Sequence, residues 1–274
     1  MKNFLIFLIS LVGACVLVLT LSPSFAQTNV HLTMGNPSNA ATFNLTNYLL
    51  VKSQYVLSYN CNKGISNWAS WQLNRSWLGN AARQNNFRSD TSLPSGCNQV
   101  TDSNYSGSGF DRGHMTPSAD RSNSTTNNSA TFLMTNIIPQ APDSNQGVWA
   151  DLEDYSRDLV QKGGKELYIM SGGYGVGGTG SKGTASTIAS GKVTVPNRTW
   201  KIIVVLDRSG NASSVTNATR VIAVDIPNTQ GIRNNNWKTY RVSVDSIEKK
   251  TGYNFLTNVP TKTQSVIEAK VDNQ

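Results

Sequence analysis

The sequence predicts an α+β fold, with a mostly antiparallel central sheet flanked by helices. Two observations support this: eight short segments are rich in β-branched and aromatic residues, and one long segment has clear helical spacing. The candidate strands are residues 49–59, 68–73, 131–138, 166–171, 192–195, 200–206, 220–226 and 239–244. Shorter helices are expected at residues 244–250 and 263–271.

The long helix is expected at residues 147–162. Four apolar side chains recur there at steps of four, three and four, namely Val148, Leu152, Tyr155 and Leu159. Gly163 follows as a candidate cap. Glu153 and Arg157 are i,i+4 neighbours beside the apolar stripe, where a surface salt bridge is the default interpretation.

Two segments rich in turn residues interrupt the later strands. Residues 196–198, Pro-Asn-Arg, separate two candidate strands and predict a hairpin between residues 192–195 and 200–206. Residues 172–180 contain six glycines but lack the Gly-Lys-Ser/Thr of a phosphate-binding loop. We expect a flexible surface loop there.

The N-terminus has the pattern of an export signal. Lys2 precedes an almost unbroken apolar run at residues 4–21, and Ser-Phe-Ala at residues 24–26 is a small-x-small cleavage site. A membrane anchor is the alternative, but Pro23 follows the run at once and no basic stop flanks it. We therefore expect residues 1–26 to be removed, no membrane association afterwards, and a secreted or periplasmic protein.

The mature chain, residues 27–274, is interpreted as one domain after a short polar segment that ends near Phe43. Removing residues 1–26 removes one charge, Lys2, so the formal net charge of +8 becomes +7. This basic balance, with a pI near 9.4, favours an anionic partner such as nucleic acid.

The mature chain has two cysteines, Cys61 and Cys97. In an exported protein two cysteines can form a disulfide, and the alternative is two unpaired thiols. No motif around either cysteine indicates a nucleophile, and no Cys/His cluster has zinc spacing.

Residues 110–121, hereafter the signature, hold the clearest catalytic parts. His114, one of only two histidines, is preceded by Asp111, Arg112 and Gly113. A histidine suits proton transfer near neutral pH, an arginine can bind phosphate, and a glycine permits a close backbone approach. The alternative from these residues alone is a salt-bridged turn with an inert histidine.

Two blocks resemble the DNA/RNA non-specific endonuclease family, whose members share a ββα-metal fold. The first is Asp-Arg-Gly-His-Met-Thr-Pro-Ser-Ala-Asp at residues 111–120. The second comprises residues 135–140, 145–149 and 152–154, similar to the family's metal-binding Asn segment and the helix after it. The likeness runs from about Tyr55 to the C-terminus, with a catalytic core expected near residues 55–260.

The resemblance implies a mechanism with one general base and one divalent ion. His114 would be the base that activates water. Asn145 would be the only direct ligand of the ion, most simply Mg²⁺ with Mn²⁺ as a substitute. Glu153 would hold a water on the ion, and Asn136 would order the site.

Several charged residues are carried over from the same resemblance. Arg83 and Arg157 are the candidates to clamp the phosphate, with Arg88 as a rival to Arg83. Arg112 is either part of this site or a structural residue that ties the signature to the sheet. Asp111 is expected to orient the region without being a direct metal ligand.

The expected activity is hydrolysis of both DNA and RNA to 5′-phosphate ends, because phosphate contacts carry no sequence information. A dedicated polypeptide inhibitor is a further expected partner. Two alternatives stay open at this point: an exported nucleic-acid-binding or uptake protein without catalysis, and a phosphodiesterase of small nucleotides.

Overall fold

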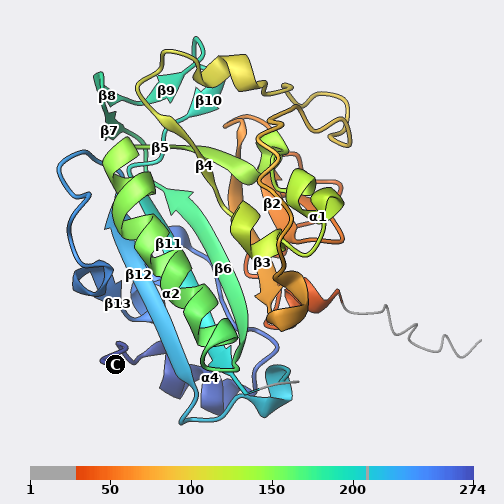
Figure 1. Ribbon diagram of the computed structural model, residues 1–274, viewed down its shortest axis with the longest axis vertical. Coiled ribbons are helices and arrows are strands. Elements are labelled where there is room, and N and C mark those ends of the chain that lie inside the picture. Colours follow the sequence, from red (N-terminus) through yellow and green to blue (C-terminus); the bar gives the residue numbers. More distant parts are fainter. Residues whose placement is uncertain (1–28, 208–209) are drawn as a thin grey trace, which may run out of the picture.

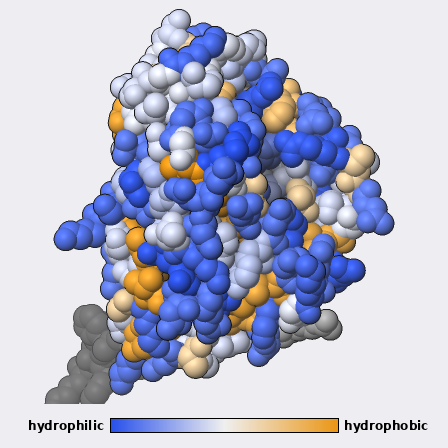
Figure 2. All heavy atoms as spheres, turned by 60° about the vertical axis from the view of Figure 1, so that its left-hand side comes forward, coloured by the Kyte–Doolittle hydropathy of each residue, from blue (hydrophilic) through white to orange (hydrophobic). Residues whose placement is uncertain are grey.

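The computed structural model describes residues 29–207 and 210–274. The expected export signal lies outside these residues. Among the helices described, none is both long and apolar enough to cross a bilayer. Most of the molecular face in Figure 2 is hydrophilic, with apolar side chains in scattered patches.

A seven-stranded sheet forms the centre of the molecule, and every neighbouring pair in it is antiparallel (Figure 1). In spatial order its strands are β1 (Tyr48–Val51), β2 (Val56–Asn60), β3 (Ile65–Leu73), β6 (Glu166–Tyr174), β11 (Arg198–Leu206), β12 (Arg220–Pro227) and β13 (Arg241–Val242). The antiparallel α+β prediction is confirmed.

In the described part of the chain, three two-stranded ribbons lie outside the sheet. They pair β4 (Asp111–His114) with β5 (Ile137–Gln140), β7 (Gly178–Gly180) with β8 (Gly183–Ala185), and β9 (Thr187–Ile188) with β10 (Val193–Thr194). The β4–β5 ribbon and α2 (Ala150–Gln161), which follows it, make a ββα unit.

The sheet is buried on both faces because its strands alternate side chains between two cores. On β11, Ile203 belongs to the core under α2, whereas Ile202 and Val204 belong to the core on the other face. α3 (Val244–Thr251) and α4 (Thr261–Glu268) contribute Val244, Ile247 and Ile267 to that second core. The small helix α1 (Thr125–Ala130) lies beside the signature.

Three predicted strands differ from the observed ones. The segment 49–59 divides into β1 and β2, which form a hairpin whose turn is closed by Lys52 N donating to Tyr55 O at 2.9 Å. In 131–138 only the end is a strand, since Met134–Asn136 is a 3₁₀ turn. In 239–244 the strand is only β13, and Trp237–Tyr240 is another 3₁₀ turn.

The predicted hairpin around residues 196–198 is wrong. β10 pairs with β9, while β11 pairs with β6 and β12. The connecting residues bond to other segments: Val195 N donates to Ser186 O, and Asn197 N donates to Tyr174 O. These tertiary contacts determine the pairing, and the local turn composition does not.

The glycine-rich segment is not the flexible loop we expected. Gly172 is buried within β6, and a Cβ atom there would lie 2.4 Å from Asn67 O and 2.6 Å from the Trp200 ring. Gly178–Gly180 forms β7. Glycine therefore serves close packing at this position.

The long helix begins in regular α form at Ala150, three residues later than expected. Ser144–Trp149 is a π turn, and Gly147 in it has φ −116° and ψ −110°. A Cβ on Gly147 would lie 2.2 Å from Arg233 O, so only glycine fits.

Cys61 at the end of β2 is joined to Cys97 by a disulfide, with the Cα atoms 4.7 Å apart. The structure thus selects the disulfide over two free thiols.

Candidate active site

β4 presents the signature's acid and histidine on a ribbon held by β5. Asp111 lies opposite Gln140, and His114 lies opposite Ile137. A Cβ on Gly113 would lie 2.0 Å from Gln140 Oε1, so the glycine between them lets the buried Gln140 side chain pack against the backbone.

His114 is buried between aromatic rings, with centroids 4.9 Å from Phe132 and 5.5 Å from Phe87. Its Nε2 atom has no hydrogen-bond partner among the described residues. Burial, followed by the positive charge of Arg83, lowers the pKa of His114 to about 3, although a hydrogen bond with the Arg112 backbone opposes the shift. The ring is therefore neutral near pH 7 and able to accept a proton.

Asn136 is fully buried and orders the turn after His114. Its Oδ1 accepts from Thr116 N at 2.9 Å, and its Nδ2 donates to Thr116 O and Thr131 O, each at 2.9 Å. With its amide committed to the backbone, Asn136 acts on the site through the fold of this turn.

Asp111 fixes the orientation of Asn145. Asp111 Oδ2 accepts from Asn145 Nδ2 at 2.8 Å and from Gln146 Nε2 at 2.7 Å. Because a carboxylate accepts and does not donate, the Asn145 nitrogen must face Asp111. Asn145 Oδ1 accepts no hydrogen bond from any described residue, and a carbonyl oxygen of this kind suits a hard divalent cation.

A polar cavity of about 440 Å³ opens beside these residues. Among the side chains that line it are Arg83, Phe87, Tyr105, Asp111, Arg112 and Asn145. His114, Asn136, Glu153 and Arg157 do not line it. A larger cavity of about 640 Å³ near Arg220 contains none of the expected site residues.

Arg83 and Arg88 have different surroundings. Arg83 donates to Ser118 Oγ at 2.5 Å and to Asn85 Oδ1 at 2.8 Å, and its guanidinium lies 4.9 Å from the Phe132 ring centroid. Burial lowers the pKa of Arg83, and the charge of Glu153 opposes that shift.

Arg88 instead donates to two backbone carbonyls, Asn86 O at 3.2 Å and Ser129 O at 2.9 Å. Only Arg83 of the two arginines lines the cavity.

Arg112 lines the cavity, stacks 4.6 Å from the Phe87 ring centroid, and forms an ion pair with Asp102. Asp102 lies in the 3₁₀ turn Asp102–Tyr105, not in the central sheet. The expected tie between Arg112 and the sheet is therefore replaced by a tie to this turn.

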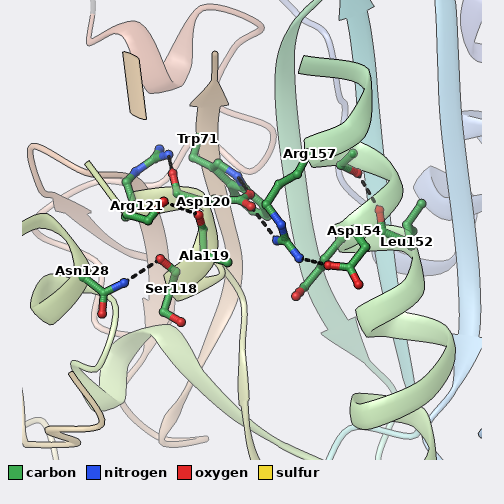
Figure 3. Close-up of polar contacts among 12 residues, drawn as sticks. Trp71, Ser118, Ala119, Asp120, Arg121, Asn128, Leu152, Asp154 and Arg157 are labelled. Carbon is green, nitrogen blue, oxygen red and sulfur yellow. Dashed lines mark hydrogen bonds and ion pairs between the residues drawn. The ribbon is translucent and has the colours of Figure 1, made fainter. Parts of the chain in front are cut away.

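Glu153 and Arg157 on α2 do not form the ion pair expected between them. Each is paired with a different residue. Figure 3 shows Arg157 reaching toward Asp120, beside Trp71, and toward Asp154 on its own helix. The Arg157–Asp120 ion pair is 2.9 Å long. Burial opposes the charge of Arg157, but Asp120 and then Glu153 outweigh it and raise the pKa above its ordinary value.

Glu153 Oε1 lies 3.3 Å from Lys201 Nζ on β11. Burial raises the pKa of Glu153, while the charges of Lys201 and Arg157 oppose the shift. The charge of Arg83 acts on His114 and helps burial to lower its pKa, and the charge of Glu153 in turn acts on Arg83, where it opposes the lowering of the pKa by burial. The structure thus brings together three sequence segments that carry predicted site residues.

Sequence reasoning missed Lys201, Asp120 and Phe132. Lys201 had a visible signal, since it is the only charged residue in the apolar run 200–206. Asp120 belongs to the signature but received no role. The single cluster of three acidic metal-ligand candidates in the described residues, Asp245, Glu248 and Glu268, lies on α3 and α4 and includes no expected site residue.

Comparisons with known proteins show which family this chain is similar to. The model of the family described as DNA/RNA non-specific endonuclease matches residues 34–262. A nuclease of Nostoc sp. is 56% identical over 256 residues, covering 92% of this chain and 89% of the relative. The nuclease of Serratia marcescens is 27% identical over 231 residues, covering 82% and 81%.

A solved structure of an EndoG/EndoGI complex contains a similar chain, with a TM-score of 0.71 and 22% identity. The match covers 88% of this chain and 96% of that one, and it supports the fold alone.

Proposed function

Because the chain belongs to the DNA/RNA non-specific endonuclease family, we propose that it hydrolyses internal phosphodiester bonds of both DNA and RNA and leaves 5′-phosphate ends. One observation carries the proposal: His114 is neutral, its Nε2 has no partner among the described residues, and its ring contacts Phe87, which lines a polar cavity.

The residues present fit a divalent ion. Asn145 would hold it directly through Oδ1, because Asp111 has already taken the amide nitrogen. Glu153 would hold one of its waters, and Mg²⁺ with Mn²⁺ as a substitute suits such an oxygen-only set. When bound, the ion would supply positive charge to the phosphate and to the departing 3′-oxygen.

Side chains of the protein would transfer the proton and bind the phosphate. His114 Nε2 would take the proton of the attacking water as its oxygen bonds to phosphorus and the 3′-oxygen leaves. Arg83 would hold a phosphate oxygen from the cavity wall, and Arg112 is placed to add a second contact. Arg157 would act by holding Asp120 of the signature against α2, since both its ion pairs are with protein carboxylates.

This arrangement has no need of a base edge or of a 2′-hydroxyl. Contacts to phosphate alone carry no sequence information. A water nucleophile also treats ribose and deoxyribose alike. We therefore propose little sequence preference and activity on both nucleic acids.

Export and inhibition complete the proposal. The apolar run and cleavage site at residues 1–26 support secretion or export to a periplasm. A dedicated polypeptide inhibitor is supported by the similar chain, which was solved as an EndoG/EndoGI complex that concerns the inhibition of EndoG.

The test is cleavage of supercoiled plasmid and of a long RNA by residues 27–274, with Mg²⁺ and with EDTA. We expect nicking, then linear DNA, and RNA degradation, all abolished by EDTA. A dinucleotide should be a much poorer substrate than a long duplex. Binding without cleavage would overturn the proposal in favour of a non-catalytic protein, and preference for the dinucleotide would indicate a small-nucleotide phosphodiesterase.

A further inference from the structure

Lys201 is a charged side chain in the core of the protein. It lies on β11 between Ser171 of β6 and Val224 of β12, and only 1% of it is exposed. Its side chain is on the same face of β11 as Ile203, the face covered by α2. Burying an ammonium group is costly unless it is paired, so its partner is informative.

That partner is Glu153. Among the described residues, the only carboxylate within ion-pair distance of Lys201 Nζ is Glu153, whose Oε1 lies 3.3 Å away. Aromatic rings fill the remaining space, with the Trp149 centroid 4.0 Å and the Trp71 centroid 5.9 Å from Nζ. The ammonium group is thus held between indole faces and one glutamate.

The neighbouring cation on α2, Arg157, is committed to other carboxylates. Arg157 is bound to Asp120 and Asp154, and Asp120 also accepts from Trp71 Nε1 at 2.9 Å. Two acids, Glu153 and Asp120, therefore have separate cations. The position of the Glu153 carboxylate depends on Lys201.

We propose that Lys201 is a positioning residue for the reaction: its buried ammonium fixes Oε1 of Glu153 and so sets the direction in which the other carboxylate oxygen is presented to the metal's water. Glu153 Oε2 accepts no hydrogen bond from any described residue, which leaves it available. The inference rests on the proposed role of Glu153 and extends it to a residue that itself touches neither metal nor substrate.

The test is a double-mutant cycle of Lys201→Met and Glu153→Gln, read by Mn²⁺ affinity from electron paramagnetic resonance and by kcat. Lys201→Met replaces the lysine by an unbranched apolar side chain one atom shorter and removes its charge. We expect it to weaken Mn²⁺ binding by about tenfold and to lower kcat, the size seen when an outer partner of a metal site is lost. The double variant should be no worse than Glu153→Gln alone.

Lys52→Met is the matched control. Lys52 also forms a largely buried ion pair, 2.9 Å from Asp90, but neither residue contacts Glu153. We expect this variant to lose stability and to keep both Mn²⁺ affinity and kcat. A Lys201→Met variant with wild-type Mn²⁺ affinity, or losses that simply add in the double variant, would overturn the inference.

A loss of folding, and a failure of the proposed role of Glu153, can each be distinguished from a failure of the inference about Lys201. If Lys201→Met does not fold, the double variant, which removes both charges, should be more stable, and its comparison with Glu153→Gln still decides the question. Under those conditions a double variant worse than Glu153→Gln contradicts the inference. If Glu153→Gln itself leaves Mn²⁺ affinity and kcat unchanged, the proposed role of Glu153 fails, and the inference fails with it.

Discussion

The two histidines of this protein lie in regions that differ in one decisive respect. Both rings are buried, and both pKa values are lowered by burial and then by an arginine, to about 4 for His31 and about 3 for His114. His31, however, has both nitrogens paired: Nδ1 accepts from Gln72 N at 3.1 Å, and Nε2 meets Ser53 O at 3.0 Å. His114 leaves Nε2 unpaired.

Burial and a lowered pKa therefore do not by themselves identify a catalytic histidine. His31 ties the N-terminal segment to β3, an attachment that Ser70 Oγ reinforces by donating to His31 O at 2.6 Å. His114 instead keeps a basic nitrogen free beside Arg83 and near a polar cavity. A free ring nitrogen, together with the groups around it, is the feature that separates the two.

The largest expected effect comes from exchanging each histidine for alanine. His114→Ala should lose about 10²- to 10⁴-fold in turnover, because it removes the proposed general base. His31→Ala should keep its turnover per folded molecule and lose about 2 kcal/mol or more in stability, because a buried ring and its two hydrogen bonds are lost. Plasmid cleavage and urea unfolding of both variants measure the contrast.

A His31→Ala protein that is fully folded yet inactive would contradict this contrast between the two histidines. So would a His114→Ala protein with normal turnover.

The second prediction uses pH. His31 has a folded-state pKa of about 4 against an ordinary value of 6.5, so between these values the unfolded chain binds more protons and stability falls as pH falls. The His31 part of that loss is at most roughly 3 to 4 kcal/mol. His31→Gln lacks this linkage, so the stability difference between wild type and variant should shrink from pH 7 to pH 4.

Urea titrations at several pH values supply this difference. A difference that stays constant over that range would show that His31 is not buried in its neutral form.

The third prediction concerns Asp111, which has no counterpart beside His31. Asp111→Asn removes the charge that holds the amide nitrogens of Asn145 and Gln146, so Asn145 Oδ1 is no longer fixed. We expect Mg²⁺ or Mn²⁺ to bind about 10- to 100-fold more weakly. Calorimetric titration measures this, with the exposed Asp207→Asn as a control. Equal affinities in the two variants would argue against Asn145 as the ligand.

Some parts of the fold could be predicted from the sequence, and others could not. Strand and helix patterns predicted the antiparallel sheet and α2, because local periodicity records which face is buried. The pairing of β10 with β9 was missed, since it depends on contacts from distant segments. Lys201 was missed for a similar reason: nothing local relates it to Glu153, 48 positions earlier.

The family resemblance named Asn136, but only the structure shows how it could act, through its bonds to Thr116 and Thr131. Likewise, the resemblance could not choose firmly between Arg83 and Arg88, and the cavity lining distinguishes them.

The smallest expected effect is that of salt. Each phosphate neutralised on duplex DNA contributes a slope of about −0.9 in log affinity against log salt, so two contacts predict roughly a tenfold loss between 50 and 200 mM NaCl. The rate at limiting substrate and fixed Mg²⁺ should fall accordingly, and Arg83→Gln should flatten the slope by about one contact. A rate independent of salt would contradict phosphate binding in the cavity.

The most direct test of His114 as the general base is chemical rescue. His114→Gly leaves space for a free base, so added imidazole should restore part of the DNA cleavage, and the restored rate should rise with pH as imidazole itself loses its proton. Rescue requires that metal and phosphate are still held correctly, which Mn²⁺ binding and circular dichroism of the variant verify. A folded variant that binds Mn²⁺ and gains no activity from imidazole would contradict the assignment.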